Sequence, residues 1–286
     1  MRSRDASDLY RSAVIDYFAG KAHDYDRVDE QVYWRLSDRL LWELITELLP
    51  SGGEDFTFLD AGGGTGRWTE RIARNYPGSS GVLYDLSPAM LAEARKKLSG
   101  RDRLADRVTL REGDLAVVGE ALASERFDVV ICLHNVAGFV PSFERCFTEL
   151  AGLLHPGGVI VLVAPNQYHM AWYSVLRKEF GNAESALHDG CGRFTADMPV
   201  MDLFTPARLA RLSQSADLDV ITLTGFPVLI YPGFEETQIS GDSPGAAGVL
   251  SGHDGFGCVL ALERRAIREP DVAARGANLF LAARRR

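Results

Sequence analysis

Hydrophobic and polar residues follow two periods along this chain. Over residues 31–50, leucine and isoleucine recur at helical spacing with Arg and Glu between them, which predicts an amphipathic helix ending at Pro50. Short and almost entirely apolar runs predict strands that are buried on both faces. These runs lie at residues 56–59, 82–84, 108–110, 127–133 and 159–165.

Helical patterns separate the strand runs. Helices are expected at residues 67–76, at 87–100, where Ser87-Pro88 opens the helix and Gly100 ends it, and at 143–154. Thr205-Pro206 opens a further helix, residues 256–268 have a helical pattern, and strands are expected at 220–224 and 278–282. This alternation predicts an α/β fold with a Rossmann-like, seven-stranded, mostly parallel sheet and helices on both faces.

Three segments do not fit simple strand–helix connections. Residues 1–50 precede the first strand and are expected to form an N-terminal helical cap, or lid. Residues 166–204 and 225–275 are too long for ordinary loops, so we expect them to be insertions on the substrate side, after the fifth and sixth strands. The whole chain, residues 1–286, is predicted to be one domain around a cofactor-binding core at 55–165.

Composition narrows the class of protein. The net charge is −8, and clustered basic residues are what a phosphate backbone requires, so a nucleic-acid partner is not expected. The N-terminus lacks the apolar run of a signal peptide, and no stretch approaches the roughly 18 apolar residues of a membrane span. The four cysteines are scattered without metal-ligand spacing. A cytoplasmic protein with no membrane association and no bound metal is predicted.

The run FLDAGGGTGRW, residues 58–68, carries the most specific chemistry in the chain. It lacks the lysine of a phosphate-binding Walker loop, and Arg67 stands where a dinucleotide-binding fingerprint requires glycine or alanine. Asp60 ends the strand before the glycines, where a carboxylate would repel a pyrophosphate but could accept hydrogen bonds from an ammonium group. The run therefore favours a cofactor that carries an amino acid over one that carries phosphates.

This pattern resembles the class I S-adenosylmethionine-dependent methyltransferases, of the methyltransferase-11/25 type. Matches at YDL (84–86), GDL (113–115), FDVVICLHNV (127–136) and LLHPGG (153–158) extend the resemblance over residues 55–165. It implies that Asp85 holds both ribose hydroxyls of S-adenosylmethionine, that Leu86 and Met90 flank the adenine, and that Asp114 accepts from the adenine amine. The full set of cofactor contacts expected from the resemblance is Arg35, Asp60, Gly62, Gly63, Gly64, Gly66, Asp85, Leu86, Met90, Gly113, Asp114, Leu115, Leu133 and His134.

Several of these residues allow a second interpretation. Asp85 could be a solvated strand end, and Asp114 could be only a helix N-cap. His134, at the end of the fourth strand, could contact the cofactor, act as a general base or be a packed imidazole. Tyr25 could cover the cofactor as part of a lid and supply a base, or could only anchor a helix. His134 and Tyr25 are the candidate catalytic residues.

Substrate residues are expected where the fifth strand ends. Asn166, Tyr168, His169 and Trp172 follow that strand, and substrates bind at the carboxyl ends of parallel strands. Locally, LDAGGGTG, YDLSPAM and the tail from Leu262 are similar to the bacterial tRNA 5-carboxymethoxyuridine methyltransferase group. In that group a basic residue before the first strand contacts the cofactor, and Arg35 is the nearest match. Residues 169–199 lack the basic run that a tRNA stem would need.

The sequence thus predicts a methyltransferase that uses S-adenosylmethionine and yields S-adenosylhomocysteine. The expected acceptor is a small, partly aromatic molecule, and the protein is expected to be a monomer or homodimer. A tRNA methyltransferase, a nicotinamide-dependent oxidoreductase and a family member that binds the cofactor without catalysis are the alternatives.

Overall fold

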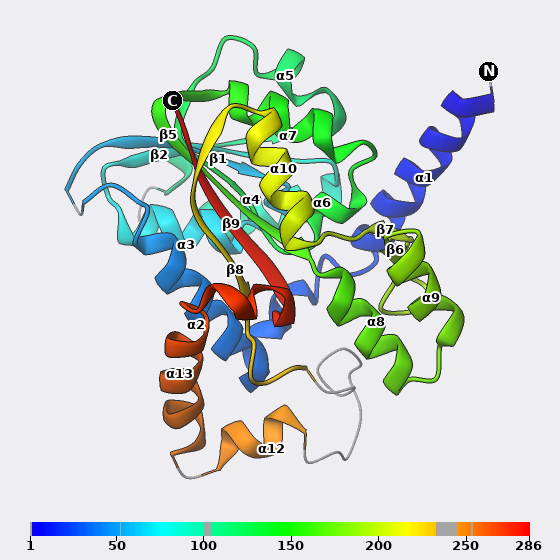
Figure 1. Ribbon diagram of the computed structural model, residues 1–286. Helices are drawn as coiled ribbons and strands as arrows, with labels where there is room; N and C mark the ends of the chain where they lie inside the picture. The colour runs from blue at the N-terminus through cyan, green and yellow to red at the C-terminus, as the bar shows by residue number, and fades with distance from the viewer. Residues whose placement is uncertain (1, 52, 100–103, 233–244, 253) are drawn as a thin grey trace.

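The computed structural model describes residues 2–51, 53–99, 104–232, 245–252 and 254–286 (Figure 1). Gly100, the predicted end of a helix, and residues 233–244 of the second predicted insertion lie outside this set.

A seven-stranded sheet runs through the molecule in the order β3-β2-β1-β4-β5-β9-β8. Its strands are β1 (Phe56–Ala61), β2 (Ser79–Asp85), β3 (Val108–Glu112), β4 (Phe127–Cys132), β5 (Leu154–Pro165), β8 (Leu218–Phe226) and β9 (Asn278–Arg285). The first five are parallel to one another, whereas β9 is antiparallel to both β5 and β8. The predicted mostly parallel, Rossmann-like sheet is confirmed.

Helices cover the sheet and extend beyond it. The α-helices are α1 (Arg2–Ala19), α2 (Val32–Thr46), α3 (Arg67–Asn75), α4 (Pro88–Ser99), α5 (Val118–Ala121), α6 (Val136–Phe139), α7 (Phe143–Gly152), α8 (Gln167–Leu176), α9 (Phe180–His188), α10 (Pro206–Ser215), α12 (Ala246–Ser251) and α13 (Gly255–Ala266). Short 3₁₀-helices are η1 (Tyr25–Glu30), η2 (Leu104–Asp106), η3 (Leu115–Val117) and η4 (Pro270–Arg275).

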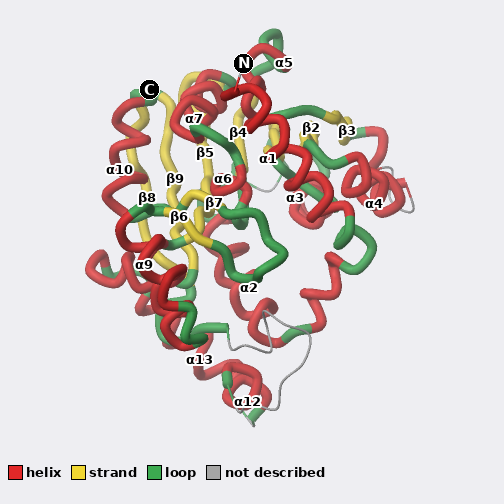
Figure 2. Tube along the Cα trace, turned by 90° about the vertical axis from the view of Figure 1, so that its right-hand side faces the viewer, coloured by secondary structure: helices red, strands yellow, loops and turns green. Residues whose placement is uncertain are grey.

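Alternation along the strands divides the core into two layers. Phe58 of β1 packs on one face, in a cluster shared with α2, α3, α4 and α13, whereas Leu59 packs on the other, with α5, α7 and α10. A third cluster joins α1, α6, α8 and α9 beside the sheet. Figure 1 shows the start of α1 projecting from the body, and Figure 2 shows α12 and α13 at the opposite end of the molecule from α5.

The fifth strand differs from its sequence prediction. It begins at Leu154 rather than Val159, because Leu154 pairs with Phe127 before the register shifts and Val159 takes up pairing with Val129. The intervening His-Pro-Gly-Gly segment is therefore an irregularity inside the strand, where Gly157 adopts a φ of +80°. Proline and glycine signalled a turn, but tertiary pairing retains the segment in β5.

The first insertion carries α8, α9 and a two-stranded sheet of β6 (Cys191–Gly192) and β7 (Met201–Asp202). The described part of the second insertion carries α12, α13 and η4. No helix among the described residues has the length and apolar character needed to cross a membrane.

Glu263 of α13 anchors the chain that follows β8. Its side chain is fully buried, and its carboxylate accepts the backbone N–H groups of Val228, Leu229 and Ile230 at 2.9, 2.7 and 3.0 Å. Hydrogen bonds to a charged acceptor contribute more than neutral ones, and removal of the acceptor leaves buried donors unpaired. Glu263 thus fixes the backbone that leads to Pro232.

We expect Glu263→Ala to lower the free energy of unfolding by about 2–4 kcal/mol, because three backbone donors lose their acceptor. Glu263→Gln, which retains an acceptor oxygen, should lose less. Leu262→Ala, at a neighbouring side chain that is 58% exposed, is the matched control. Urea denaturation measures all three, and equal midpoints for Glu263→Ala and the control would contradict the anchoring role.

Candidate functional site

A cavity of about 670 Å³ opens where the parallel strands end. In β1 and β2, Ala61 pairs with Tyr84, and Asp60 also pairs with Ile131 of β4, so the last residues of these strands meet at one edge of the sheet. The loops that follow the strands form one wall of the cavity, and α1 and η1 form another. The volume lies within the range of about 300–1,000 Å³ that is usual for small-molecule sites.

The glycine loop exposes bare backbone to this cavity. Gly62 and Gly64 have φ angles of +78° and +55°, which side chains rarely adopt. A Cβ atom at Gly62 would lie 2.5 Å from Val136, whereas a Cβ at Gly64 would have no atom within 4 Å. The space beside Gly64 is thus free for a ligand that approaches the main chain.

Asp85 connects this loop to the helix that follows β2. One carboxylate oxygen accepts the N–H of Gly64 and the other accepts the N–H of Ser87, both at 2.8 Å. Burial raises the pKa of the Asp85 carboxyl, although these backbone donors oppose the shift. Each oxygen retains lone pairs for a further donor, so the carboxylate can hold a ligand diol as well as the loop.

Asp60 lies behind the glycines with a side chain that is 2% exposed. Its carboxyl accepts the Thr69 hydroxyl at 2.6 Å. Burial raises the pKa of Asp60 to about 7; the Thr69 hydrogen bond opposes this shift, and the charge of Asp85 adds to it. A cation in the cavity would stabilise the ionised form of this carboxyl.

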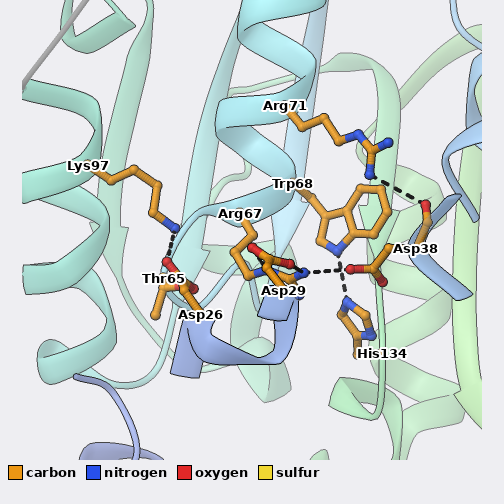
Figure 3. Close-up of polar contacts among 9 residues, drawn as sticks. All are labelled: Asp26, Asp29, Asp38, Thr65, Arg67, Trp68, Arg71, Lys97 and His134. Carbon is orange, nitrogen blue, oxygen red and sulfur yellow. Dashed lines mark hydrogen bonds and ion pairs between the residues drawn. The ribbon is translucent and has the colours of Figure 1, made fainter. Parts of the chain in front are cut away.

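His134 has a fixed tautomer. Its Nε2 accepts a hydrogen bond from Trp68 Nε1 at 2.8 Å (Figure 3). An indole N–H only donates, so Nε2 carries a lone pair and the proton of the neutral ring is on Nδ1. Burial lowers the pKa of His134, which keeps the ring neutral. His134 is therefore arranged to donate from Nδ1 rather than to remove a proton with Nε2.

Tyr25, the other candidate catalytic residue, lies on η1 in the cavity wall. Burial raises the pKa of its phenol to about 12. A phenol that keeps its proton at neutral pH donates hydrogen bonds and does not act as a base. The Phe18 ring lies 6.5 Å from the Tyr25 ring in an edge-on arrangement.

Ion pairs hold η1 against the glycine loop (Figure 3). Asp26 accepts the Thr65 hydroxyl at 2.6 Å and pairs with Lys97 of α4 at 2.5 Å. Arg67, directly after the glycines, pairs with Asp29 of η1 and, at 2.5 Å, with Asp38 of α2. The arginine that departs from the dinucleotide fingerprint thus fastens the N-terminal cap to the loop, a role that local sequence does not signal.

Asp114 has one of the roles considered for it, the helix N-cap, and makes an ion pair that the sequence did not predict. Its Oδ1 accepts the N–H of Ala116 at 2.8 Å, as the N-cap of η3. Its Oδ2 pairs with Arg11 of α1 at 3.2 Å, on the cavity wall. The N-cap interpretation therefore holds, and the second oxygen also connects α1 to the loop after β3.

The cavity brings together most of the predicted cofactor residues. Those in its wall are Asp60, Gly62, Gly63, Gly64, Asp85, Leu86, Met90, Asp114, Leu115, Leu133 and His134. Gly66 is the N-cap of α3, Gly113 lies against Tyr84, and Arg35 is exposed with its guanidinium 5.9 Å from the Phe256 ring. These three lie outside the cavity wall. The wall itself contains two arginines, Arg11 and Arg67.

Of the four predicted substrate residues, His169 lies in the cavity wall. Asn166 is buried and donates to the carbonyl oxygens of Ala274 and Gly276 at 2.9 and 2.6 Å, so its amide connects β5 to η4. Tyr168 and Trp172 are 47% and 39% exposed. The structure therefore separates one buried cavity residue from three that lie outside.

Sequence reasoning missed two amide groups in the same wall. Gln31 Oε1 and Asn135 Oδ1 are buried and accept no hydrogen bond from any described residue. Buried acceptors of this kind suit a ligand with several donors, such as an ammonium group. Asn135 directly follows His134 at the end of β4, which is the signal that could have identified it. Among the described residues, no group of three His, Cys, Asp or Glu side chains could hold a metal ion.

Comparison with known proteins identifies the same core. Residues 58–158 match a family model described as "Methyltransferase domain". The chain is 27% identical over 178 residues to trans-aconitate 2-methyltransferase of Deinococcus radiodurans, covering 62% of this chain and 64% of that protein. It is 29% identical over 152 residues to the ubiquinone/menaquinone biosynthesis C-methyltransferase UbiE of Methylobacterium nodulans, covering 53% and 58%. Each match spans less than two thirds of the relative's length.

A solved structure shares the fold over most of the chain. It is an S-adenosylmethionine dependent methyltransferase from Mesorhizobium loti, with a TM-score of 0.58, 21% sequence identity, and coverage of 86% of this chain and 98% of that one.

The raised pKa of Asp60 predicts a pH-dependent stability. Between about pH 4 and pH 7 the folded protein holds a proton that the unfolded chain has lost, so this group lowers the free energy of unfolding as the pH rises through that window. We expect the free energy of unfolding of Asp60→Asn, relative to that of the wild type, to increase by about 1.4 kcal/mol per pH unit across this window. Above the window the difference should stay constant.

Urea denaturation from about pH 4.5 to about pH 8 measures the free energy of unfolding of the wild type and of Asp60→Asn. Asp219→Asn, at an exposed carboxyl whose pKa is lowered by a hydrogen bond from Arg286, should show no such gain. Parallel stability curves for wild type and Asp60→Asn would refute the predicted titration of Asp60.

Proposed function

We propose that this chain, whose residues 58–158 form a class I S-adenosylmethionine-dependent methyltransferase domain, transfers a methyl group from S-adenosylmethionine to a small, partly aromatic acceptor. The observation that carries the proposal is the loop at Gly64. It combines open space, an exposed backbone and a carboxylate with two acceptor oxygens at one edge of a parallel sheet.

The residues of the cavity fit S-adenosylmethionine part by part. Asp85 suits the two ribose hydroxyls because each of its oxygens can accept one more hydrogen bond. Leu86, Met90 and Leu115 offer apolar surface to the adenine. For the amino-acid part, Asp60 and the unpaired amide oxygens of Gln31 and Asn135 are acceptors for an ammonium group.

Bound S-adenosylmethionine supplies a methyl group activated by its sulfonium. The chain's own residues bind and orient the reactants and keep water out, and alignment of this kind lowers a barrier by up to about 7–11 kcal/mol in favourable cases. Tyr25 keeps its proton and His134 presents Nδ1–H, so neither is placed to act as a general base at neutral pH. The acceptor atom is therefore a nucleophile that needs no base from these two residues.

A small acceptor agrees with the charges around the cavity. Arg11 and Arg67 in the wall are paired with Asp114, Asp29 and Asp38, so they are not available to a phosphate backbone. The net charge of −8 points the same way. Aromatic rings of Phe18, Phe139 and Phe194 line the cavity and suit a flat, apolar acceptor.

We expect Asp85→Ala to weaken the binding of S-adenosylhomocysteine at least about 100-fold, because two hydrogen bonds from hydroxyl groups to a carboxylate are lost. Isothermal titration calorimetry measures this. Asp219→Ala, a carboxylate removed at an exposed position of β8, should bind like the wild type. Affinity of Asp85→Ala within threefold of the wild type would refute the assignment of the ribose site.

We also expect the affinity for S-adenosylmethionine to fall as the pH drops below about 7. Protonation of Asp60 removes the acceptor for the ammonium group, so the dissociation constant should rise about tenfold per pH unit. Burial also raises the pKa of the neighbouring Asp85 carboxyl, so the Asp60→Asn variant is needed to separate the contribution of Asp60. An equally steep pH dependence in Asp60→Asn would assign the effect elsewhere.

Methyl transfer itself is tested by incubation with S-adenosylmethionine and a panel of aromatic amines and thiols with and without ring hydroxyl groups, with S-adenosylhomocysteine measured by mass spectrometry. Product that depends on the acceptor supports the proposal. Saturable cofactor binding without turnover across the panel would indicate a non-catalytic family member.

A further inference from the structure

His169 is a buried polar side chain in the cavity wall without a hydrogen-bond partner among the described residues. It lies on α8, is 5% exposed, and has no hydrogen bond to any residue in the described part of the chain. Burial lowers the pKa of His169 to about 4, so the imidazole is neutral at physiological pH. A neutral imidazole presents one N–H donor and one nitrogen acceptor.

Three aromatic rings surround this imidazole. Trp172 stacks on it at 5.2 Å between ring centroids, Tyr231 lies at 5.3 Å and Phe194 at 6.3 Å. The Tyr231 hydroxyl lies within hydrogen-bond distance of the carbonyl oxygens of Val228 and Arg275, at 3.1 and 2.8 Å. Because Tyr231 is held by backbone that Glu263 and η4 position, the aromatic surroundings of His169 are preorganised.

A nearby buried polar residue, Asn166, has a purely structural role. Asn166, three residues earlier, uses its amide nitrogen on two carbonyl oxygens and its oxygen on the N–H of Tyr168. Its polar atoms are thus satisfied within the protein, as buried polar groups usually are. His169 is also buried, but it lies in the cavity wall without a hydrogen bond to the described residues, so the cavity is where a partner can reach it.

We propose that His169 binds a neutral hydroxyl group on the aromatic ring of the methyl acceptor and thereby fixes the orientation of that ring. The inference rests on the proposed function and names the substrate class of its site. A hydroxyl matches a neutral imidazole because each has one donor hydrogen and at least one acceptor. A carboxylate at this position would instead require a cationic partner.

The cavity wall around His169 supports a ring-bearing acceptor. Phe194 lies beside the imidazole, and Phe18 and Phe139, which pack edge to face at 5.3 Å, belong to the same cavity. Such walls bind an aromatic ring by burial and by edge-to-face contact, but they do not distinguish one edge of the ring from another. A single polar group among apolar walls supplies that orientation.

The test uses two probes that differ only in a hydroxyl group, 2-naphthol and naphthalene. Their affinities are measured by fluorescence titration with the protein saturated in S-adenosylhomocysteine. We expect the preference for 2-naphthol over naphthalene to fall about tenfold in His169→Phe, which keeps an aromatic ring but loses the polar atoms. His169→Gln, which keeps a donor and an acceptor, should restore most of the preference.

A merely structural role for His169 would change the affinities for both probes together, whereas the proposal requires naphthalene affinity to stay constant. His188→Phe, the same substitution at an exposed histidine on α9, is the matched control and should keep the wild-type preference. An unchanged preference in His169→Phe, or failure of both probes to bind the wild type, would overturn the role of His169.

S-adenosylhomocysteine binding is measured on the same preparations. Wild-type protein that does not bind it would refute the proposed function itself, whereas normal binding with an unchanged probe preference would refute only the assignment of His169.

Discussion

The carboxylate of Asp85 is the contact on which the cofactor end of the cavity depends. It accepts one N–H from the glycine loop and one from the start of α4, so two segments that follow different strands share one anchor. Gly64 adopts a positive φ that glycine tolerates more readily than other residues, and the hydrogen bond to Asp85 holds that conformation in place. Under the proposed function, a single buried carboxyl group would therefore couple loop geometry to cofactor binding.

Charge then attaches the N-terminal cap to this rigid base. Asp26 and Asp29 of η1 contact Thr65, Lys97 and Arg67, and the Arg67–Asp38 pair is nearly buried, with side chains 12% and 10% exposed. Burial of such a pair costs the solvation of both charges, which offsets much of their attraction. The pair therefore serves to position η1 and α2 at least as much as to stabilise the fold. Tyr25 also belongs to η1. The ion pairs that hold η1 against the loop therefore fix the position of one wall of the cavity.

The sequence specified the sheet, the glycine loop and the acids at the strand ends, because each follows from a local pattern. Apolar runs marked the strands, and the glycines together with Asp60 marked a loop close to a ligand. Local patterns do not reveal which residues meet in the tertiary structure, and the differences between prediction and structure arise from such contacts. Arg35 lies over the ring of Phe256 on α13, and the amide of Asn166 donates to the backbone carbonyl oxygens of Ala274 and Gly276. Neither contact could be inferred from spacing along the chain.

The two imidazoles of the cavity illustrate why residue type alone does not assign chemistry. His134 accepts from Trp68 through Nε2, which fixes its tautomer and places the ring proton on Nδ1. His169 has no such partner among the described residues and retains both a donor and an acceptor. Burial keeps both rings neutral, so neither supplies a cation for a carboxylate. These two imidazoles are neutral, directional hydrogen-bonding groups beside aromatic walls, and under the role proposed for His169 they would select acceptors by where a hydroxyl lies on the ring rather than by charge.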